Sequence, residues 1–379
     1  MIDVGKEHVK KLGYKKVNGE VRLNKELRSR FKIGIDDVCQ VNKTKGGDGL
    51  AFYDRKNDNY DLAMFLTGAF DVDTVHKACN WIYKNKECFG ETILEIGCDI
   101  GAMTTFLGSL FPEKKIVSID RNAKGVEIAR RNCEKMGVTN IEFRNCDAKD
   151  LHGEKFDTVF TMRVFHENCD IEEPDPASIF DDWTDAYSSG FDAFSSTVSN
   201  LIKEDGNLIS IERMDRDCVL CGFIDAIGAH GLRPVIETYE DLKCLELGMY
   251  EEHFQCMVSR MEPGSELDVC EFYADCFMKY TPVDKAIYSG FEARAMFSFT
   301  ADELIDGFIA RFVDGRIYRF EIRTYSGDKS CIVVYCFNGQ SATTVYCHSC
   351  DLEKCRSDME KSILDIGKSG AANIEMVRA

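Results

Sequence analysis

The spacing of apolar residues changes twice between residues 93 and 120. Residues 93–96 form a mainly apolar run that leads into a glycine-containing turn. Apolar residues then recur at helical spacing as far as Pro112, and a second apolar run, 116–119, ends at Asp120. The pattern predicts a strand, a helix and a second strand, with a ligand pocket at the carboxyl ends of the two strands.

The same alternation of strand and helix patterns continues further along the chain. Helical spacing begins at Asp61 and predicts a helix over 75–83 ahead of the first strand. After Asp120 the pattern predicts helices over 122–137, 179–202 and 218–230, and strands over 140–143, 156–162, 207–211, 234–239 and 253–259. Strands that alternate with helices favour a parallel sheet with helices on both faces.

The C-terminal part of the chain, residues 265–379, has a different pattern. Charged and apolar residues alternate over 318–323, which predicts a strand with one face in water. Residues 331–337 and 342–347 read as strands joined by a two-residue hairpin at Asn338-Gly339. The apolar residues over 352–366 lie at helical spacing. An antiparallel sheet with a packed helix, an α+β accessory domain, is therefore predicted here.

Residues 1–60 are polar, weakly patterned and basic over 6–45, and Gly46-Gly47-Asp48-Gly49 forms a break. We interpret this segment as an N-terminal arm in solvent. The alternative is an arm that docks on an acidic partner or on nucleic acid. The predicted domain division is therefore an extension over 1–60, an α/β domain over 61–262 and the accessory domain over 265–379.

The turn after the first predicted strand indicates which kind of nucleotide the pocket binds. A dinucleotide site needs closely spaced glycines, because backbone must approach a doubly charged pyrophosphate. Here the turn contains two carboxylates, Glu95 and Asp99, which would repel phosphates. A cofactor that has a positive centre and no phosphate is favoured, and S-adenosylmethionine, a sulfonium, fits this description.

The turn resembles motif I of the class I S-adenosylmethionine-dependent methyltransferases, and later segments resemble the family's other motifs in order. Asp99 departs from the glycine that is usual in the middle of motif I. The resemblance implies a Rossmann-like seven-stranded sheet, with Asp120 on the ribose and Asp147 on the adenine. The cofactor-binding residues that it implies are Glu95, Gly97, Cys98, Asp99, Gly101, Asp120, Arg121, Cys146, Asp147, Ala148 and Arg163. In the loop after the fourth strand, His166 is the candidate catalytic base.

Composition adds limits to this interpretation. The net charge of -18 disfavours a nucleic-acid partner. No apolar run has membrane-spanning length and the first residues are charged, so a cytoplasmic protein without a membrane partner is expected, its 18 cysteines being thiols. Two cysteine pairs, 218/221 and 347/350, have metal-like spacing, but chance explains both in a cysteine-rich chain, and no metal is expected.

The leading hypothesis is therefore a methyltransferase that acts on a small molecule or a protein by in-line methyl transfer. A non-catalytic S-adenosylmethionine-binding or assembly protein is the alternative. A nicotinamide dehydrogenase is disfavoured by the missing third glycine. The predicted jobs of the accessory domain are substrate selection, covering the site, or assembly of a homodimer.

Overall fold

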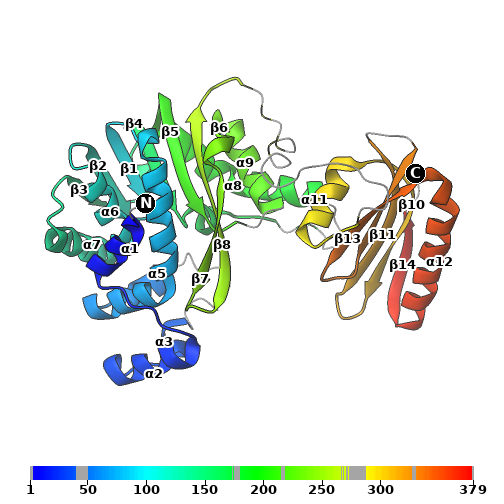
Figure 1. Ribbon diagram of the computed structural model, residues 1–379, viewed down its shortest axis with the longest axis horizontal. Helices are drawn as coiled ribbons and strands as arrows, with labels where there is room; N and C mark the ends of the chain where they lie inside the picture. Colours follow the sequence, from blue (N-terminus) through cyan, green and yellow to red (C-terminus); the bar gives the residue numbers. More distant parts are fainter. Residues whose placement is uncertain are drawn as a thin grey trace. The chain divides into compact units, whose positions relative to one another are not determined.

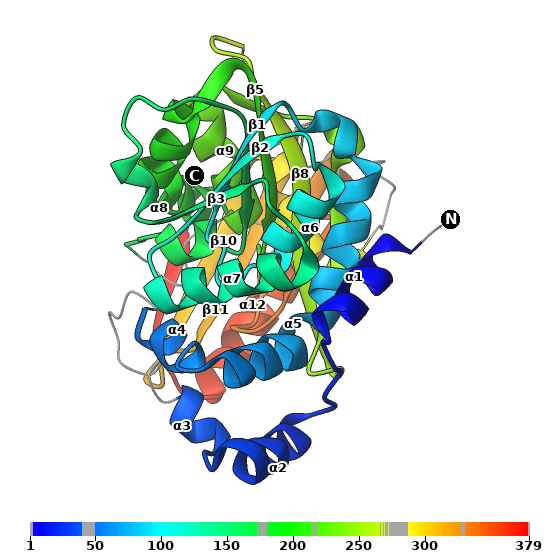
Figure 2. The same cartoon turned by 90° about the vertical axis from the view of Figure 1, so that its left-hand side faces the viewer.

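The chain forms two compact units, which are described separately (Figures 1 and 2). The first unit contains residues 1–169, 191–214 and 226–267, and the second contains 170–190, 215–225 and 268–379. This computed structural model describes residues 3–39, 50–172, 174, 180–214, 218–265, 267, 269, 272, 287–326 and 330–377.

The first unit is built on an eight-stranded sheet whose order is β3-β2-β1-β4-β5-β8-β6, with β7 paired to β8. The first five strands in this order are parallel, and β8 is antiparallel to its neighbours. The strands are β1 (Thr92–Ile96), β2 (Lys115–Asp120), β3 (Ile141–Asn145), β4 (Phe156–Met162), β5 (Ile202–Glu212), β6 (Leu232–Pro234), β7 (Glu240–Glu246) and β8 (Tyr250–Met261). The predicted fold class is confirmed, with one strand more than expected because β7 and β8 form a hairpin.

Helices α5 (Tyr60–Lys84) and α6 (Ala102–Leu110) cover one face of this sheet (Figure 2). Their apolar side chains, such as Trp81 and Phe106, pack on β1, β4, β5 and β8 in one buried cluster. Helix α7 (Ala123–Met136) starts at Asn122, whose side chain accepts a hydrogen bond from Gly125 N. Helices α8 (Phe180–Asn200) and α9 (Cys218–Ala229) each begin with residues of the second unit and end with residues of the first.

The N-terminal residues differ from the expected arm in solvent. They form α1 (Val4–Leu12), α2 (Glu20–Phe31), α3 (Ile35–Cys39) and α4 (Leu50–Lys56). Leu23 and Leu27 of α2 are fully buried and belong to one apolar cluster with Leu62 and Leu66 of α5. The prediction failed because the apolar stripe of α2 is narrow and is surrounded by basic residues, which dominate the local composition. Residues 40–49, which include the glycine break, lie outside the described residues.

The second unit is a six-stranded antiparallel sheet in the order β14-β10-β11-β12-β13-β9. Its strands are β9 (Ile287–Ser289), β10 (Ala301–Phe312), β11 (Ile317–Tyr325), β12 (Cys331–Phe337), β13 (Ala342–His348) and β14 (Ala371–Val377). Helix α12 (Leu352–Lys368) packs on one face and α11 (Phe291–Thr300) on the other, each through its own apolar cluster. The predicted helix and hairpin are present, although the hairpin loop runs over residues 338–341.

The charged face of β11 is buried, which contradicts the predicted exposure of this face. Glu321 is fully buried and its carboxylate pairs with the guanidinium groups of Arg319 and Arg323 on the same strand. Gly307 lies opposite Glu321 on β10, and a side chain there would lie within 2.7 Å of a backbone oxygen of β11. Each arginine lies two residues from Glu321 on the same strand and is paired with it. This face can therefore be covered without burying an isolated charge.

We expect Glu321→Ala to lower the free energy of unfolding by about 3–5 kcal/mol, because it removes the carboxylate that both arginines share. Urea unfolding of the full chain would measure this change. Glu303→Ala, an exposed change on neighbouring β10, is the matched control and should alter stability by less than about 0.5 kcal/mol. Equal effects of the two changes would contradict the role given to Glu321.

Candidate active site

The turn between β1 and α6 needs glycine at two positions. Gly97 and Gly101 both have φ near +80°, a region that residues with a Cβ rarely adopt. A Cβ on Gly97 would lie 2.6 Å from Val164 of the loop after β4, and one on Gly101 would lie 2.8 Å from the Ala129 side chain. The glycines therefore let the turn pass close to its neighbours, with the first turn of α6 at the edge of the pocket.

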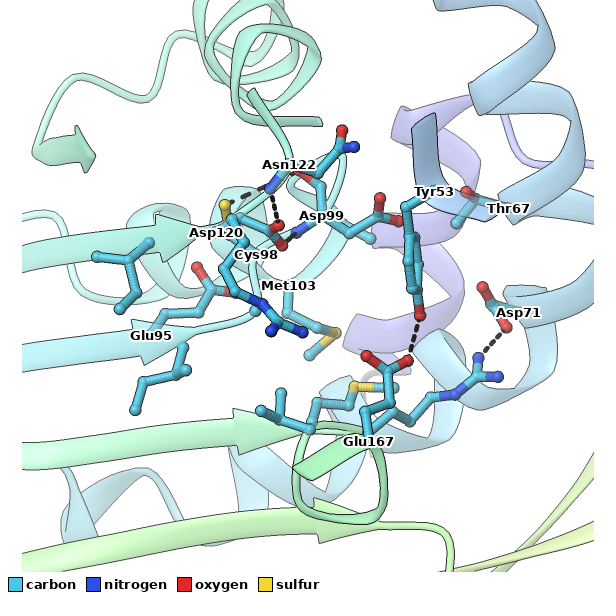
Figure 3. Close-up of a pocket in the computed structure, with 18 of the residues that line it drawn as sticks. Tyr53, Thr67, Asp71, Glu95, Cys98, Asp99, Met103, Asp120, Asn122 and Glu167 are labelled. Atoms are coloured by element: carbon cyan, nitrogen blue, oxygen red, sulfur yellow. Dashed lines mark hydrogen bonds and ion pairs between the residues drawn. The ribbon is translucent and has the colours of Figure 1, made fainter. Parts of the chain in front are cut away.

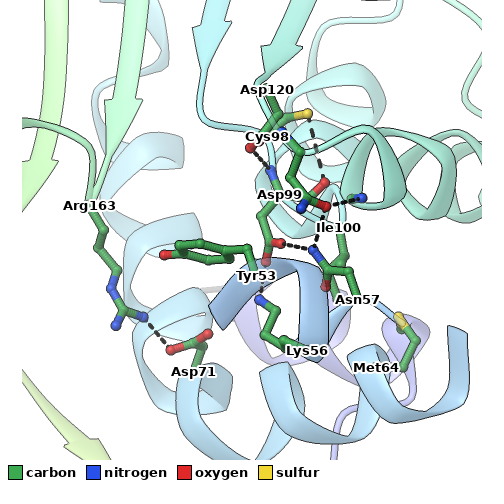
Figure 4. A network of polar contacts seen from close by, with 12 residues as sticks. Tyr53, Lys56, Asn57, Met64, Asp71, Cys98, Asp99, Ile100, Asp120 and Arg163 are labelled. Atoms are coloured by element: carbon green, nitrogen blue, oxygen red, sulfur yellow. Dashed lines mark hydrogen bonds and ion pairs between the residues drawn. The ribbon is translucent and has the colours of Figure 1, made fainter. Parts of the chain in front are cut away.

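Asp99 lies between the two glycines, at the middle position where motif I usually has glycine. Its backbone also has a positive φ, of 43°. Asp and Asn tolerate this region better than other residues with a side chain. The Asp99 carboxylate forms an ion pair with Lys56 of α4 and accepts a hydrogen bond of 2.9 Å from Asn57 Nδ2 (Figure 4). Lys56 is 6% exposed, so its charge is directed at Asp99 instead of at solvent.

Asp120 ends β2 and lines the pocket (Figure 3). Its Oδ2 accepts a hydrogen bond of 2.8 Å from Asp99 N, and its Oδ1 accepts one of 2.7 Å from Asn122 N. Burial raises the pKa of Asp120, and the hydrogen bond from Asn122 acts in the opposite direction. Each carboxylate oxygen still has a second lone pair, so the group can also accept ribose hydroxyls.

Glu95 of β1 is a buried carboxyl group at the bottom of the pocket (Figure 3). Its Oε2 accepts hydrogen bonds of 2.6 Å from both Thr104 Oγ1 and Ser118 Oγ. Burial raises the pKa of Glu95 to about 7, although the two hydroxyl groups act in the opposite direction. The pKa of this carboxyl group therefore lies near neutral pH.

The segment after β3 supplies Cys146, Asp147 and Ala148 to the pocket. Asp147 begins a short 3₁₀ helix, η3 (Ala148–Asp150), and its Oδ1 accepts a hydrogen bond of 3.1 Å from Lys149 N. Asp150 Oδ2 in turn accepts one from Asp147 N. This reciprocal capping fixes Asp147 and the buried Ala148 at the carboxyl edge of the sheet.

The loop after β4 carries Arg163, His166 and Glu167, all of which line the pocket. Arg163 has φ of 62° and forms an ion pair with Asp71 of α5, which raises the pKa of the guanidinium (Figure 4). Glu167 accepts a hydrogen bond of 2.6 Å from Tyr53 Oη of α4. Helix α4 therefore contacts the pocket on two sides, at Asp99 and at Glu167.

These elements enclose a cavity of about 680 Å³, a size typical of small-molecule sites. Every predicted site residue lines it except Gly101, which lies behind the turn against Ala129. Further residues line it that were not predicted as site residues, namely Tyr53, Lys56, Thr67, Asp71, Phe194, Arg213 and Glu246. Helical spacing from Asp61 included Thr67 and Asp71, and the predicted helix over 179–202 included Phe194, but a helical pattern does not identify the side chains that enter the pocket.

Among the described residues, no group of three or more His, Cys, Asp or Glu side chains is arranged to hold a metal ion. Cys218 and Cys221 are buried on α9, and Cys347 and Cys350 lie at the end of β13 and just after it. No helix in the described part of the chain is long and apolar enough to cross a membrane.

Residues 87–218, about a third of the chain, match the sequence model of a family described as a methyltransferase domain. This chain contains a methyltransferase domain. The match lies on the segment that carries the predicted cofactor motifs and supports the predicted family.

Two curated relatives match shorter segments. Ribosomal RNA small subunit methyltransferase C of Buchnera aphidicola is 29% identical over 110 residues, which are 28% of this chain and 34% of that protein. The uncharacterised protein YbxB of Bacillus subtilis is 36% identical over 55 residues, 14% of this chain and 27% of that protein. The chain thus spans about a third or less of the length of these relatives.

Solved structures of methyltransferases are also similar, at low identity. Magnesium protoporphyrin IX methyltransferase from Synechocystis PCC 6803 with bound S-adenosylmethionine has 15% identity and a TM-score of 0.37, covering 64% of this chain and 97% of that chain. TrmN from Thermus thermophilus has 13% identity and a TM-score of 0.35, covering 49% and 48% of the two chains. Neither similarity bears on the methyl acceptor of this chain.

We expect Lys56→Met to lower the free energy of unfolding by about 1–3 kcal/mol, because it leaves the Asp99 carboxylate without its cation. Adding Asp99→Gly should restore most of this loss, because it removes the carboxylate and suits the positive φ. Urea unfolding of the two single variants and the double variant measures the coupling. Lys124→Met, which breaks an exposed pair with Asp58, is the control and should have little effect. Simple additivity of the two single changes would contradict this coupling.

A second expectation concerns pH. The pKa of Glu95 is about 7 in the folded protein and about 4.5 in the unfolded chain, so between these values the unfolded chain has already released a proton that the folded protein keeps. Stability should therefore fall as the pH rises through this window. Glu95→Gln removes the titration and keeps an oxygen for Thr104 and Ser118. Urea unfolding should show that the variant is more stable than wild type at about pH 8, with a much smaller difference at about pH 5. An equal difference at the two pH values would contradict the raised pKa of Glu95.

Proposed function

We propose that this chain is an S-adenosylmethionine-dependent methyltransferase whose acceptor is a small molecule or a protein. The observation that carries the proposal is the cavity at the carboxyl ends of β1, β2 and β4, with the half-buried Asp120 carboxylate on its wall. Cavities at this edge of a parallel sheet are where nucleotide-type ligands bind. Because the matched domain family and this geometry involve the same segment, they support one site.

Within this proposal, each part of the cavity takes one part of the cofactor. Asp120 accepts hydrogen bonds from the ribose hydroxyls, and Asp147 with the amide of Ala148 faces the adenine. The turn at Gly97 and Cys98 faces the methionine end, where Glu95 and Asp99 favour a positive charge. The cofactor supplies a methyl group that is already activated, so the chain's own residues position the acceptor and exclude water.

The acceptor would occupy the remaining part of the cavity, beyond the ends of β4 and β5. Arg163, His166 and Glu167 line this region from one loop, and Arg213 and Glu246 line it from the other side. Both arginines are paired with carboxylates, Arg163 with Asp71 and Arg213 with Glu246. We assign His166 the role of proton acceptor here, because a histidine can take a proton near neutral pH.

The net charge of -18 supports an acceptor other than nucleic acid. The similarity to a ribosomal RNA methyltransferase involves 28% of this chain, which is too little to transfer that protein's acceptor. We keep a cytoplasmic location, the accessory role of residues 265–379 and a homodimer as parts of the proposal. The non-catalytic alternative receives no support from the family match.

Calorimetric titration should show micromolar binding of S-adenosylmethionine, roughly -8 kcal/mol, and no binding of NAD. Asp120→Ala should weaken S-adenosylmethionine binding by about 1.5–3 kcal/mol, because a carboxylate that accepts hydrogen bonds is lost. Since Asp120 also holds Asp99 N and Asn122 N, thermal unfolding of the variant must confirm that it is folded. Asp58→Ala, at an exposed acid near the pocket, is the control. Preference for NAD, or unchanged affinity in Asp120→Ala, would overturn the assignment.

A further inference from the structure

Glu212, the last residue of β5, is a fully buried carboxylate directly behind the loop that carries His166. Its Oε2 accepts hydrogen bonds from Val164 N, at 2.9 Å, and from Phe165 N, at 3.2 Å. Its other oxygen, Oε1, has no hydrogen-bond partner among the described residues. A buried carboxylate oxygen without a donor is unfavourable, so a donor is expected nearby.

His166 provides the complementary group. Its Nδ1 is buried and has no hydrogen-bond partner in the described chain, and it lies 3.8 Å from Glu212 Oε2. This distance is too long for a hydrogen bond, and Oε2 already accepts from two backbone amides, so the ring would have to move toward Oε1 to form one. One nitrogen without an acceptor therefore faces a carboxylate that has one oxygen without a donor. Catalytic hydrogen bonds are often long in empty sites and shorten when ligands bind.

We infer that Glu212 is a positioning residue that holds the Nδ1–H of His166 and so leaves Nε2 unprotonated as the proton acceptor in the pocket. The two nitrogens of an imidazole are linked, because a carboxylate that accepts from one fixes the proton there and frees the lone pair of the other. The inference rests on the proposed methyl transfer. As the acceptor's nucleophilic atom takes up the methyl group, its proton moves to Nε2 of His166, and the electron pair of the broken carbon–sulfur bond stays on sulfur.

Other charged groups near His166 are already engaged. Glu167 accepts from Tyr53 of α4, and Arg163 is paired with Asp71 of α5. Arg213, the residue after Glu212, is paired with Glu246 of β7 and Glu252 of β8. Among the described residues, Glu212 therefore has a carboxylate oxygen, Oε1, that remains open to His166. It does not line the cavity, so its effect on an acceptor passes through the histidine.

The chain offers a sharp test in Glu212→Gln. The amide oxygen of glutamine would be taken by Val164 N and Phe165 N, so the amide NH₂ would take the place of Oε1, toward which the ring of His166 is proposed to move. A donor in this place requires Nδ1 to accept, which moves the ring proton to Nε2. The variant should therefore invert the tautomer of His166 from mainly Nδ1–H to mainly Nε2–H, whereas a purely structural role for Glu212 would leave the tautomer unchanged.

Nitrogen-15 NMR of the histidine rings, in the cofactor-free protein at about pH 8, distinguishes the two tautomers, because free histidine is neutral there. His8 is the internal reference, since its Nε2 lies 2.8 Å from the Ala102 carbonyl oxygen and must donate to it. We expect His166 to differ from His8 in the wild type and to match it in Glu212→Gln. Glu212→Asp, which keeps the charge, should retain the wild-type signal.

A wild-type His166 that is mainly Nε2–H would overturn the inference by itself. The wild-type measurement therefore decides the inference even if the variant fails to fold. The same signal in wild type and in a folded Glu212→Gln would also overturn it and limit Glu212 to support of the loop. Calorimetric titration of S-adenosylmethionine is independent of this readout. Normal cofactor binding with no change of tautomer rejects the positioning role alone, and loss of cofactor binding in the wild type rejects the proposed function.

Discussion

The ion pair between Asp99 and Lys56 connects the cofactor turn to the N-terminal helices. Asp99 joins the turn to two other elements, because its amide donates to Asp120 at the end of β2 and its carboxylate binds Lys56 and Asn57 at the end of α4. The turn itself is confined by positive φ angles and close neighbours. The position of α4 over the pocket therefore depends on a side chain that the family's usual glycine does not have.

The pocket contains several carboxyl groups, and each is made tolerable in a different way. Glu95 is held by hydroxyl groups and tends to keep its proton, Asp120 accepts from two backbone amides, and Asp99 has a lysine. These arrangements leave a site that is acidic in composition but contains few unpaired charges. Such a site can accept a cationic cofactor, because its carboxyl groups are already stabilised in the interior and do not need the cofactor's charge to stay there.

The sequence predicted the parts of this site that are local in the chain. The strand, the turn with Gly97 and Gly101, and Asp120 follow one another within 28 residues, and their spacing alone identifies them. Lys56 and Asp71 come from helices that fold back onto the pocket, and a helical pattern does not show which neighbour a polar residue meets. Glu212 was missed for a related reason. An acidic residue at the end of a strand is common, and the sequence does not show which residue of another loop it contacts.

The charges of β11 were misjudged because alternation identifies two faces but not which element covers them. Glu321 pairs with Arg319 and Arg323 of its own strand, and these pairs within one strand do not indicate that the face is buried. Only the covering helix α11 and the small residue Gly307 on β10 make the arrangement possible, and both are distant in sequence from Glu321.

The buried charges of β11 also determine how its sheet pairs. A slip of one residue between β10 and β11 would turn Glu321 and its arginines toward the apolar side chains of α12 and would place a Cβ where Gly307 leaves space. Both changes are strongly unfavourable, so the charged triad acts against misaligned pairing during folding. A fully apolar face could be as stable, but it would tolerate more than one alignment of the two strands.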